Sequence, residues 1–144
     1  MSIKVFYDNV DFRLKESRKT RKIIDKVIEK EGRISGDLLF IFTDDESLRK
    51  INLEFLEHDY FTDVISFNYS IPEKINGEVY ISIDRVKENS VKYNVSLKDE
   101  VLRIMMHGVL HLLGINDESK EEKEEMRLKE DLFIEYFNSM WNEL

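Results

Sequence analysis

Hydrophobic residues recur along this chain with two different spacings. Short runs rich in β-branched and aromatic residues predict strands, and apolar residues repeated every three or four positions predict helices. The predicted strands are Ile3–Tyr7, Leu38–Phe42, Val64–Asn68 and Gly77–Ile83. The predicted helices are Ser17–Glu31, a segment capped by Asp44 or Asp45, a segment from Asp84 towards Tyr93, a segment that begins at Ser96, and about Lys120–Asn138.

The order of these segments predicts how the sheet is built. Helical segments separate the first three strands, whereas a turn over Ser70–Asn76, which holds the only proline, separates the last two. The last two strands could therefore pair as a hairpin. We predict an α+β fold in which a mixed four-stranded sheet and about five helices form a single domain over residues 1–144.

The helix that begins at Ser96 differs from the others because it is apolar on nearly all sides. Its apolar residues are Val101, Leu102, Ile104, Met105, Val109, Leu110, Leu112 and Leu113. A helix of this kind is expected to be buried at the centre of the domain and to pack on the sheet. The last helix is charged on most faces, and we interpret Glu118–Asp131 as a solvated surface with ion pairs between successive turns.

Composition narrows the class of protein. At 144 residues with 42% hydrophobic residues, the chain can bury a core of its own, and without cysteine it forms no disulfide. No apolar run approaches the roughly 20 residues that span a bilayer, and the N-terminus lacks the apolar stretch of a signal peptide. These features predict a soluble cytoplasmic protein without a membrane partner.

The formal net charge of -8 weighs against an extended nucleic-acid-binding surface. The charge is unevenly distributed, however. Basic residues gather in one stretch, at Arg13, Lys15, Arg18, Lys19, Arg21 and Lys22. A basic face could therefore coexist with an acidic total.

Two of the three histidines, His107 and His111, lie four residues apart on the apolar helix. At this spacing both imidazoles share one helix face. Gly114 can end the helix with a positive φ, and Asp117 follows closely enough to return towards the histidines. Two imidazoles and a carboxylate suit a divalent transition metal with an open coordination position. The alternative is a pair of hydrogen-bonded core histidines.

The residue after His107 restricts the chemistry of such a site. Zincin metalloproteases place a glutamate general base there, whereas this chain has Gly108. Proteolysis by that route is therefore not expected. A metal-bound water could still attack a phosphodiester or another electrophile, and a purely structural metal is a further alternative.

Three stretches resemble the YbeY-type rRNA maturation factor family. Its pattern His-Gly-x-Leu-His-Leu-x-Gly-Tyr-Asp-His is matched by His107-Gly108, Leu110-His111-Leu112 and Gly114. Its Thr-Asp-Val-Leu-Ser-Phe is similar to Thr62-Asp63-Val64-Ile65-Ser66-Phe67, and its Gly-Asp-Ile-x-Ile-Ser is similar to Gly77-Glu78-Val79-Tyr80-Ile81-Ser82. The resemblance covers most of the chain beyond residue 38.

This resemblance implies a single-strand-specific, metal-dependent endoribonuclease in rRNA processing, including 16S rRNA 3′-end maturation, and in ribosome quality control. It implies one zinc ion per chain in a cleft at the central helix, with His107, His111 and Asp117 as ligands. The expected partners are rRNA and the small ribosomal subunit or its proteins. DNA is not an expected partner, and a monomer is favoured. A non-catalytic, metal-stabilised ribosome assembly factor is the alternative, and a metal-dependent hydrolase of another substrate is a third.

The chain departs from the family pattern at two positions. Asp117 stands where relatives have a third histidine, which should keep metal binding but make a bound water less acidic. Leu56 stands where the family has an arginine expected to contact RNA, and a leucine cannot grip a phosphate. Arg103 and Arg49 are possible substitutes, although both could simply form structural ion pairs.

The catalytic residues are not assigned by the sequence. Asp63, Ser66 and Arg103 are the candidates for the cleft, and structural roles are the alternative for each. His58 is expected to be an exposed loop residue. Docking of the acidic last helix to a basic ribosomal protein is an alternative to its interpretation as a solvated surface.

Overall fold

Four strands form one mixed sheet in the computed structural model, which describes residues 2–143. The strands are β1 (Ser2–Tyr7), β2 (Ile34–Thr43), β3 (Val64–Asn68) and β4 (Lys74–Ser82), and they lie in the order β1-β2-β4-β3. The pairs β1–β2 and β2–β4 are parallel, whereas β3 and β4 pair antiparallel as a hairpin. The prediction of a mixed four-stranded sheet with a hairpin between the last two strands is confirmed.

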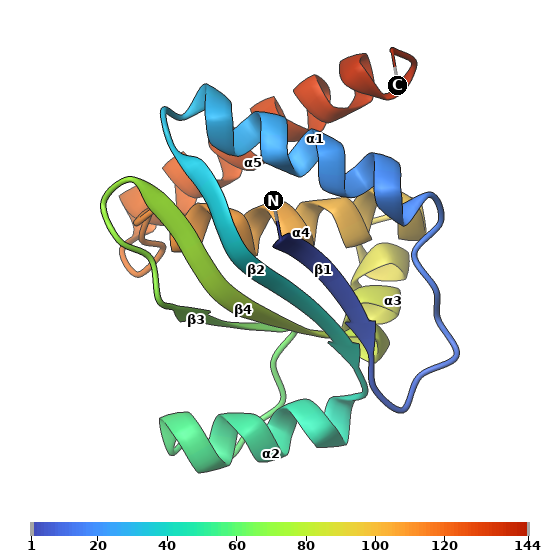
Figure 1. The fold of residues 1–144 in the computed structure, drawn as a ribbon. Helices are drawn as coiled ribbons and strands as arrows, with labels where there is room; N and C mark the ends of the chain where they lie inside the picture. The colour runs from blue at the N-terminus through green and yellow to red at the C-terminus, as the bar shows by residue number, and fades with distance from the viewer. Residues whose placement is uncertain (1, 144) are drawn as a thin grey trace.

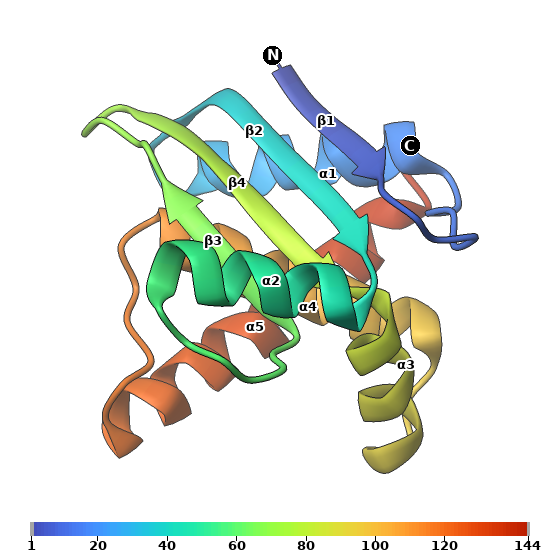
Figure 2. The same cartoon turned by 90° about the horizontal axis from the view of Figure 1, so that it is seen from below.

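Five helices surround this sheet (Figures 1 and 2). They are α1 (Ser17–Lys30), α2 (Asp45–Leu56), α3 (Ile83–Lys92), α4 (Leu97–Leu112) and α5 (Lys120–Trp141). Helices α1 and α4 pack on one face of the sheet with α5 behind them, and α2 lies against the other face. The main hydrophobic core fills the space between the sheet and helices α1 and α4.

Several boundaries differ from the prediction. Strand β2 begins at Ile34 rather than at Leu38. The polar start of the strand also pairs with β4, across a register irregularity between Ser35 and Leu38. Strand β4 begins at Lys74, which shortens the predicted turn, because buried Ile75 already alternates with less buried neighbours. Helix α5 continues beyond Asn138 to Trp141.

The start of α3 also differs, because Ser82 rather than Asp84 is its N-cap. The Ser82 side chain accepts a hydrogen bond from the Arg85 backbone N–H. Asp84 instead accepts one from the Asp45 backbone N–H, at 2.9 Å, in the first turn of α2. Asp84 therefore helps to join two helices, a role that requires tertiary contact.

Helix α4 is the central buried helix that the sequence predicts. Ten of its 16 residues are buried, and Ser96 caps it through a 3.1 Å bond from the Asp99 N–H. Gly108 lies where α4 crosses β4, and a Cβ there would lie 2.6 Å from Val79 Cγ1. The missing side chain thus allows the helix to press directly on the sheet, next to the two histidines.

None of the helices described within residues 2–143 has an apolar stretch long enough to cross a lipid bilayer.

Candidate metal centre

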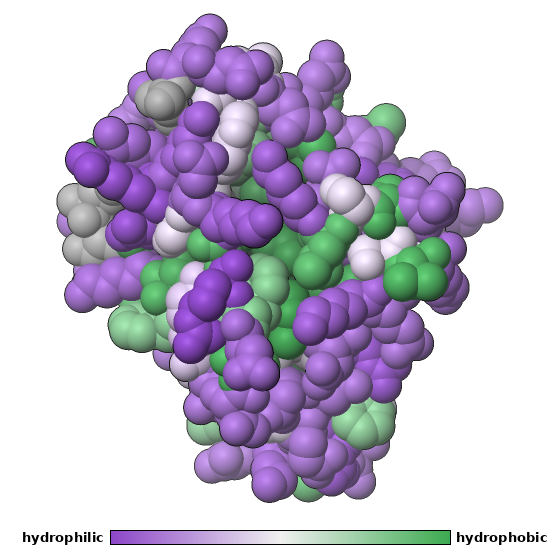
Figure 3. Space-filling model, turned by 90° about the vertical axis from the view of Figure 1, so that its right-hand side faces the viewer, coloured by the Kyte–Doolittle hydropathy of each residue, from purple (hydrophilic) through white to green (hydrophobic). Residues whose placement is uncertain are grey.

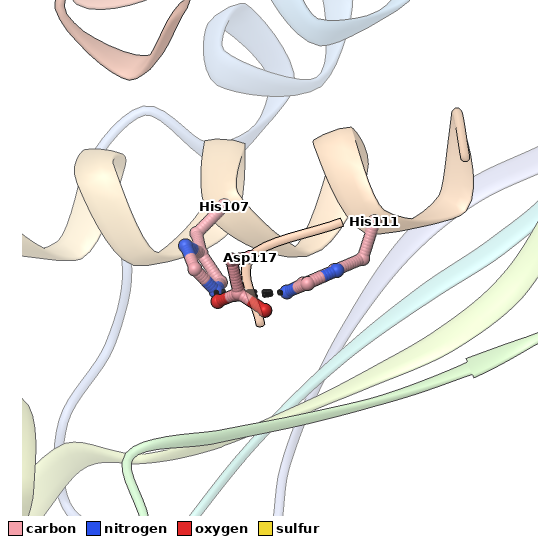
Figure 4. A group of neighbouring side chains, drawn as sticks. All are labelled: His107, His111 and Asp117. Carbon is pink, nitrogen blue, oxygen red and sulfur yellow. Dashed lines mark hydrogen bonds and ion pairs between the residues drawn. The ribbon is translucent and has the colours of Figure 1, made fainter. Parts of the chain in front are cut away.

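The end of α4 directs the chain back beneath the helix. Gly114 adopts a φ of 95°, its N–H bonds the His111 carbonyl, and the Ile115 N–H bonds the Leu110 carbonyl. These two bonds make a Schellman motif, in which the left-handed residue must be one without a Cβ penalty. The reversal brings Asp117 under the face that carries His107 and His111 (Figure 4).

Three donor atoms converge at this place. The Nε2 atoms of His107 and His111 lie 3.0 Å apart, and Asp117 Oδ2 lies 3.3 Å from the first and 3.4 Å from the second. The three side chains are partly exposed, with 18%, 28% and 33% of their surface accessible. The group is therefore reachable from solvent and could hold a metal ion.

These spacings fit a small tetrahedral ion. Ligands at about 2.0–2.1 Å from zinc in a tetrahedral arrangement lie roughly 3.3 Å from one another. The three observed separations, 3.0, 3.3 and 3.4 Å, are close to that value. With three protein donors, a fourth position stays open to water or substrate.

The imidazole of His107 is held in orientation by a second hydrogen bond. His107 Nδ1 donates to Glu130 Oε2 at 2.6 Å, which leaves Nε2 as the acceptor that faces the cluster. The backbone of Ile115, in the turn that ends α4, acts on His111 and opposes the lowering of its pKa by burial. A carboxylate or carbonyl behind a metal-binding histidine fixes its tautomer and strengthens it as a ligand.

The surroundings of His107 favour positive charge. Burial by itself lowers the pKa of His107, but the hydrogen bond and charge of Glu130, with the charges of Asp117 and Asp63, raise it above its usual value. Burial and the nearby His107 lower the pKa of His111. The same field that retains a proton on His107 would stabilise a divalent cation bound between the two histidines.

The candidate Asp63 is close enough to His107 for their charges to interact, and it lies immediately before β3. Burial raises the pKa of Asp63, against the opposing effects of His107 and of backbone N–H groups. Glu100, on the same face of α4 as His107, is only 5% exposed, and burial raises the pKa of Glu100 too. The site therefore contains buried acids that retain protons more readily than exposed ones.

The candidate Ser66 lies on β3 opposite Val79, the residue that touches the α4 backbone at Gly108. Its hydroxyl oxygen is buried and has no hydrogen-bond partner among the described residues. Ser66 thus lies on the helix-facing side of the sheet, but no contact joins it to the three donor atoms.

The candidate Arg103 lies one turn before His107 but is fully engaged by acids. Its guanidinium bonds Glu130 at 3.0 Å and Asp131 at 2.8 Å. Arg49 is paired in the same way, with Glu46 and Asp59. Both arginines therefore make the structural ion pairs that were the alternative to RNA contact.

The loop region after α2 matches its prediction. Leu56 is the last residue of α2 and is 42% exposed. His58 is exposed, as predicted, and its ring stacks on Tyr60 with the centroids 5.2 Å apart. It takes no part in the histidine cluster.

Glu130 is the site residue that the sequence interpretation missed. Glu130 was assigned to a solvated acidic surface, yet it is only 7% exposed and bridges His107 to Arg103. The buried residues of α5 are spaced as one helical stripe, namely Met126, Glu130, Phe133 and Phe137. An acid at a stripe position was the signal, because a buried carboxylate requires partners.

The fold and the cluster together define a class of protein. It is an α+β domain with a His-His-Asp group at the end of a helix packed on a mixed sheet, which is a ligand set of metal-dependent hydrolases. The family described as Endoribonuclease YbeY matches residues 6–138. The chain therefore belongs to the YbeY endoribonuclease family, a family of hydrolases that act on RNA.

Individual relatives agree with this assignment. An Endoribonuclease YbeY from Christiangramia forsetii is 43% identical over 133 residues, covering 92% of this chain and 93% of the relative. One from Flavobacterium psychrophilum is 40% identical over 137 residues, covering 95% and 98%. A solution structure from Thermotoga maritima, 24% identical, has the same fold with a TM-score of 0.69 over 98% of this chain and 92% of that one.

Proposed function

We propose that this protein is a metal-dependent endoribonuclease that cleaves single-stranded rRNA precursors. The observation that carries the proposal is the convergence of three donor atoms within 3.0–3.4 Å of one another, on a chain of the YbeY family. His107, His111 and Asp117 would hold one zinc ion. A bound zinc ion supplies a Lewis acid for the phosphoryl oxygen and lowers the pKa of a coordinated water.

The residues around the cluster would divide the remaining work. Glu130 fixes the orientation of the His107 ring through the bond to Nδ1, and would thereby direct Nε2 towards a bound ion. Asp63 is the proposed proton donor to the leaving 5′-oxygen, because its buried carboxyl keeps a proton to higher pH than an exposed aspartate. Asp117, an anion in place of the family's third histidine, would make the coordinated water less acidic.

The biological setting follows from the family. We propose 16S rRNA 3′-end maturation and ribosome quality control as the roles, in the cytoplasm. The small ribosomal subunit or its proteins would be the partner of a monomeric enzyme. The proposed enzyme consists of one domain over residues 1–144.

Purified protein tests the proposal directly. Metal-loaded and EDTA-treated samples are incubated with a 3′-extended precursor rRNA, and only the loaded sample is expected to cleave it. His111→Ala should abolish cleavage, whereas His58→Ala, which removes the exposed histidine outside the cluster, should not. Cleavage that persists in His111→Ala would show a contaminating nuclease and would leave the proposed enzyme without support.

Elemental analysis tests the ligands separately. Zinc occupancy should fall in Asp117→Ala and stay unchanged in Asp11→Ala, which alters an exposed aspartate elsewhere. Equal occupancy in both variants would exclude Asp117 as a ligand. Zinc rather than another divalent ion is expected because two imidazoles and one carboxylate suit its tetrahedral geometry.

One observation favours a second candidate function, a non-catalytic assembly factor stabilised by its metal. Arg49 and Arg103, the candidates to replace the family arginine, are both neutralised by acids. The net charge of -8 points the same way. Binding of precursor rRNA without metal-dependent cleavage in the assay above would establish this alternative.

A further inference from the structure

A hollow lies at the end of α4 opposite to the histidines. It is a cavity of about 430 Å³ between the β1–α1 loop and parts of α1, α4 and α5. Figure 3 views this side of the molecule and shows hydrophobic surface at the bottom of a hollow, with hydrophilic side chains around it. The apolar lining consists of Phe12, Leu14, Leu97, Val101, Leu102 and Trp141.

Positive charge surrounds the mouth of this cavity. Arg13, Lys15 and Lys98 line it, and Lys19 is close by, because the ammonium groups of Lys19 and Lys98 each lie 4.3 Å from the centroid of the Trp141 ring. Among residues 3–143, none of these four cations forms an ion pair with a carboxylate. Two cations beside one ring repel each other, and an anion placed between them would relieve the repulsion.

Positive charge outweighs negative charge in the lining, and within the described part of the chain its cations lack the carboxylate partners that three other arginines have. Arg49, Arg85 and Arg103 each have carboxylate partners, in a chain whose net charge is -8. Only Glu16 among the lining residues is an acid. A local excess of positive charge in an acidic protein attracts anions to that place.

The complementary ligand has a flat apolar body and attached anionic groups. An unpaired nucleotide has this chemistry, because its base can pack against the apolar lining while neighbouring phosphates contact the cations. Apart from its cations, the lining offers only Thr20 and Glu16 as polar side chains that could contact base edges. We propose that this cavity binds an unpaired nucleotide of single-stranded RNA, with little preference among bases.

This inference rests on the proposed function and adds to it a second contact with RNA. Lys98 precedes His107 by nine residues of α4, which is two and a half helical turns. The two side chains therefore point to opposite sides of the helix and lie roughly 14 Å apart along its axis. The cavity would anchor RNA without touching the scissile phosphate, so its loss should raise KM and leave kcat unchanged.

The only tryptophan of the chain, Trp141, lines the cavity and provides the assay. EDTA-treated protein is titrated with a single-stranded uridine hexanucleotide and with an adenosine hexanucleotide, and Trp141 fluorescence is recorded. Saturable quenching is expected with both, and weaker binding as salt rises. Lys15→Glu and Lys98→Glu should each weaken binding about fivefold and reduce the salt dependence. Lys50→Glu, the same charge change at an exposed residue of α2, should have no effect.

The outcomes separate this inference from the nuclease itself. Quenching that persists in His111→Ala, together with a raised KM in Lys15→Glu, supports the cavity as an anchor. Quenching by wild type without any cleavage would support the cavity and refute the proposed enzyme. Absence of quenching, or equal affinity in Lys15→Glu, Lys98→Glu and Lys50→Glu, would overturn the inference even where cleavage is normal. Quenching by laurate or hexaglutamate but not by RNA would also overturn it, and would assign the cavity to a lipid anion or an acidic peptide.

Discussion

Replacement of Glu130 tests whether the candidate metal centre depends on a residue that no local motif contains. Glu130→Gln keeps the size of the side chain and removes its charge. The amide can still accept from His107 through its oxygen, but its NH₂ group must then face the Arg103 guanidinium, which also only donates. One of the two contacts, 2.6 Å to His107 or 3.0 Å to Arg103, has to be lost.

The size of the effect follows from these contacts. Loss of the carboxylate behind a metal-binding histidine typically weakens metal affinity 10- to 100-fold, which corresponds to roughly 1.4–2.7 kcal/mol. We expect about tenfold for Glu130→Gln and closer to 100-fold for Glu130→Ala, which removes both contacts. Arg103 retains Asp131 at 2.8 Å, so the variants should still fold.

Zinc affinity is measured by competition with a coloured chelator. Glu125→Gln, at an exposed position of the same helix, is the matched control and should bind as wild type does. The ¹⁵N shifts of the His107 ring provide an independent measurement, because the Nδ1–H tautomer should lose population in Glu130→Gln and a merely structural effect would not change it. Affinity within twofold of wild type, with an unchanged tautomer, would refute the role of Glu130.

Three further predictions concern packing, pH and proton transfer. Gly108→Ala should destabilise the protein by about 1–3 kcal/mol in urea unfolding, because its Cβ would lie 2.6 Å from Val79 Cγ1. Val79→Ala in the same chain should restore part of the lost stability. Additive effects of the two substitutions would contradict this contact. Burial raises the pKa of Glu100 above 4.5, so the native state loses stability as pH rises from 4.5 through the folded-state pKa. Glu100→Gln should therefore gain stability relative to wild type over that range in unfolding experiments on metal-free protein, and a difference independent of pH would exclude this cause. Asp63→Asn should lower kcat on precursor rRNA about 10²- to 10⁴-fold with zinc occupancy unchanged, whereas normal cleavage would exclude Asp63 as the proton donor.

The elements of the fold were predictable because their signals are local. The alternation of the strands, the apolar stripes of the helices and the caps at Asp44 and Ser96 each lie within a short window of sequence. The errors came from contacts across the sequence. Ser82 replaced Asp84 as a cap because Asp84 bonds the start of α2, 39 residues away.

The histidine cluster was predictable for the same reason. His107, His111, Gly114 and Asp117 lie within eleven residues, and the helical repeat with a Schellman turn is enough to bring the donors together. Their order in the chain nearly determines their arrangement in space. The family pattern then connected this local group to RNA hydrolysis.

The surroundings of the cluster were decided only by the tertiary structure. Glu130 is 23 residues from His107 and reaches it because α5 packs on α4 through one buried stripe. The same packing pairs Arg103 with Glu130 and Asp131, so that its charge is neutralised. The sequence alone had left Arg103 as a possible RNA contact.

The cavity around Trp141 depends on the fold to a still greater degree. Three stretches far apart in the sequence supply its walls, and no spacing along the chain relates Leu14 to Leu97 or to Trp141. The sequence by itself therefore determined the elements, the family and the three donor atoms, because local backbone geometry governs all of these. Which acid supports His107, which arginine is free and where an apolar hollow meets positive charge were decided by packing, since each depends on residues brought together only when the helices close over the sheet.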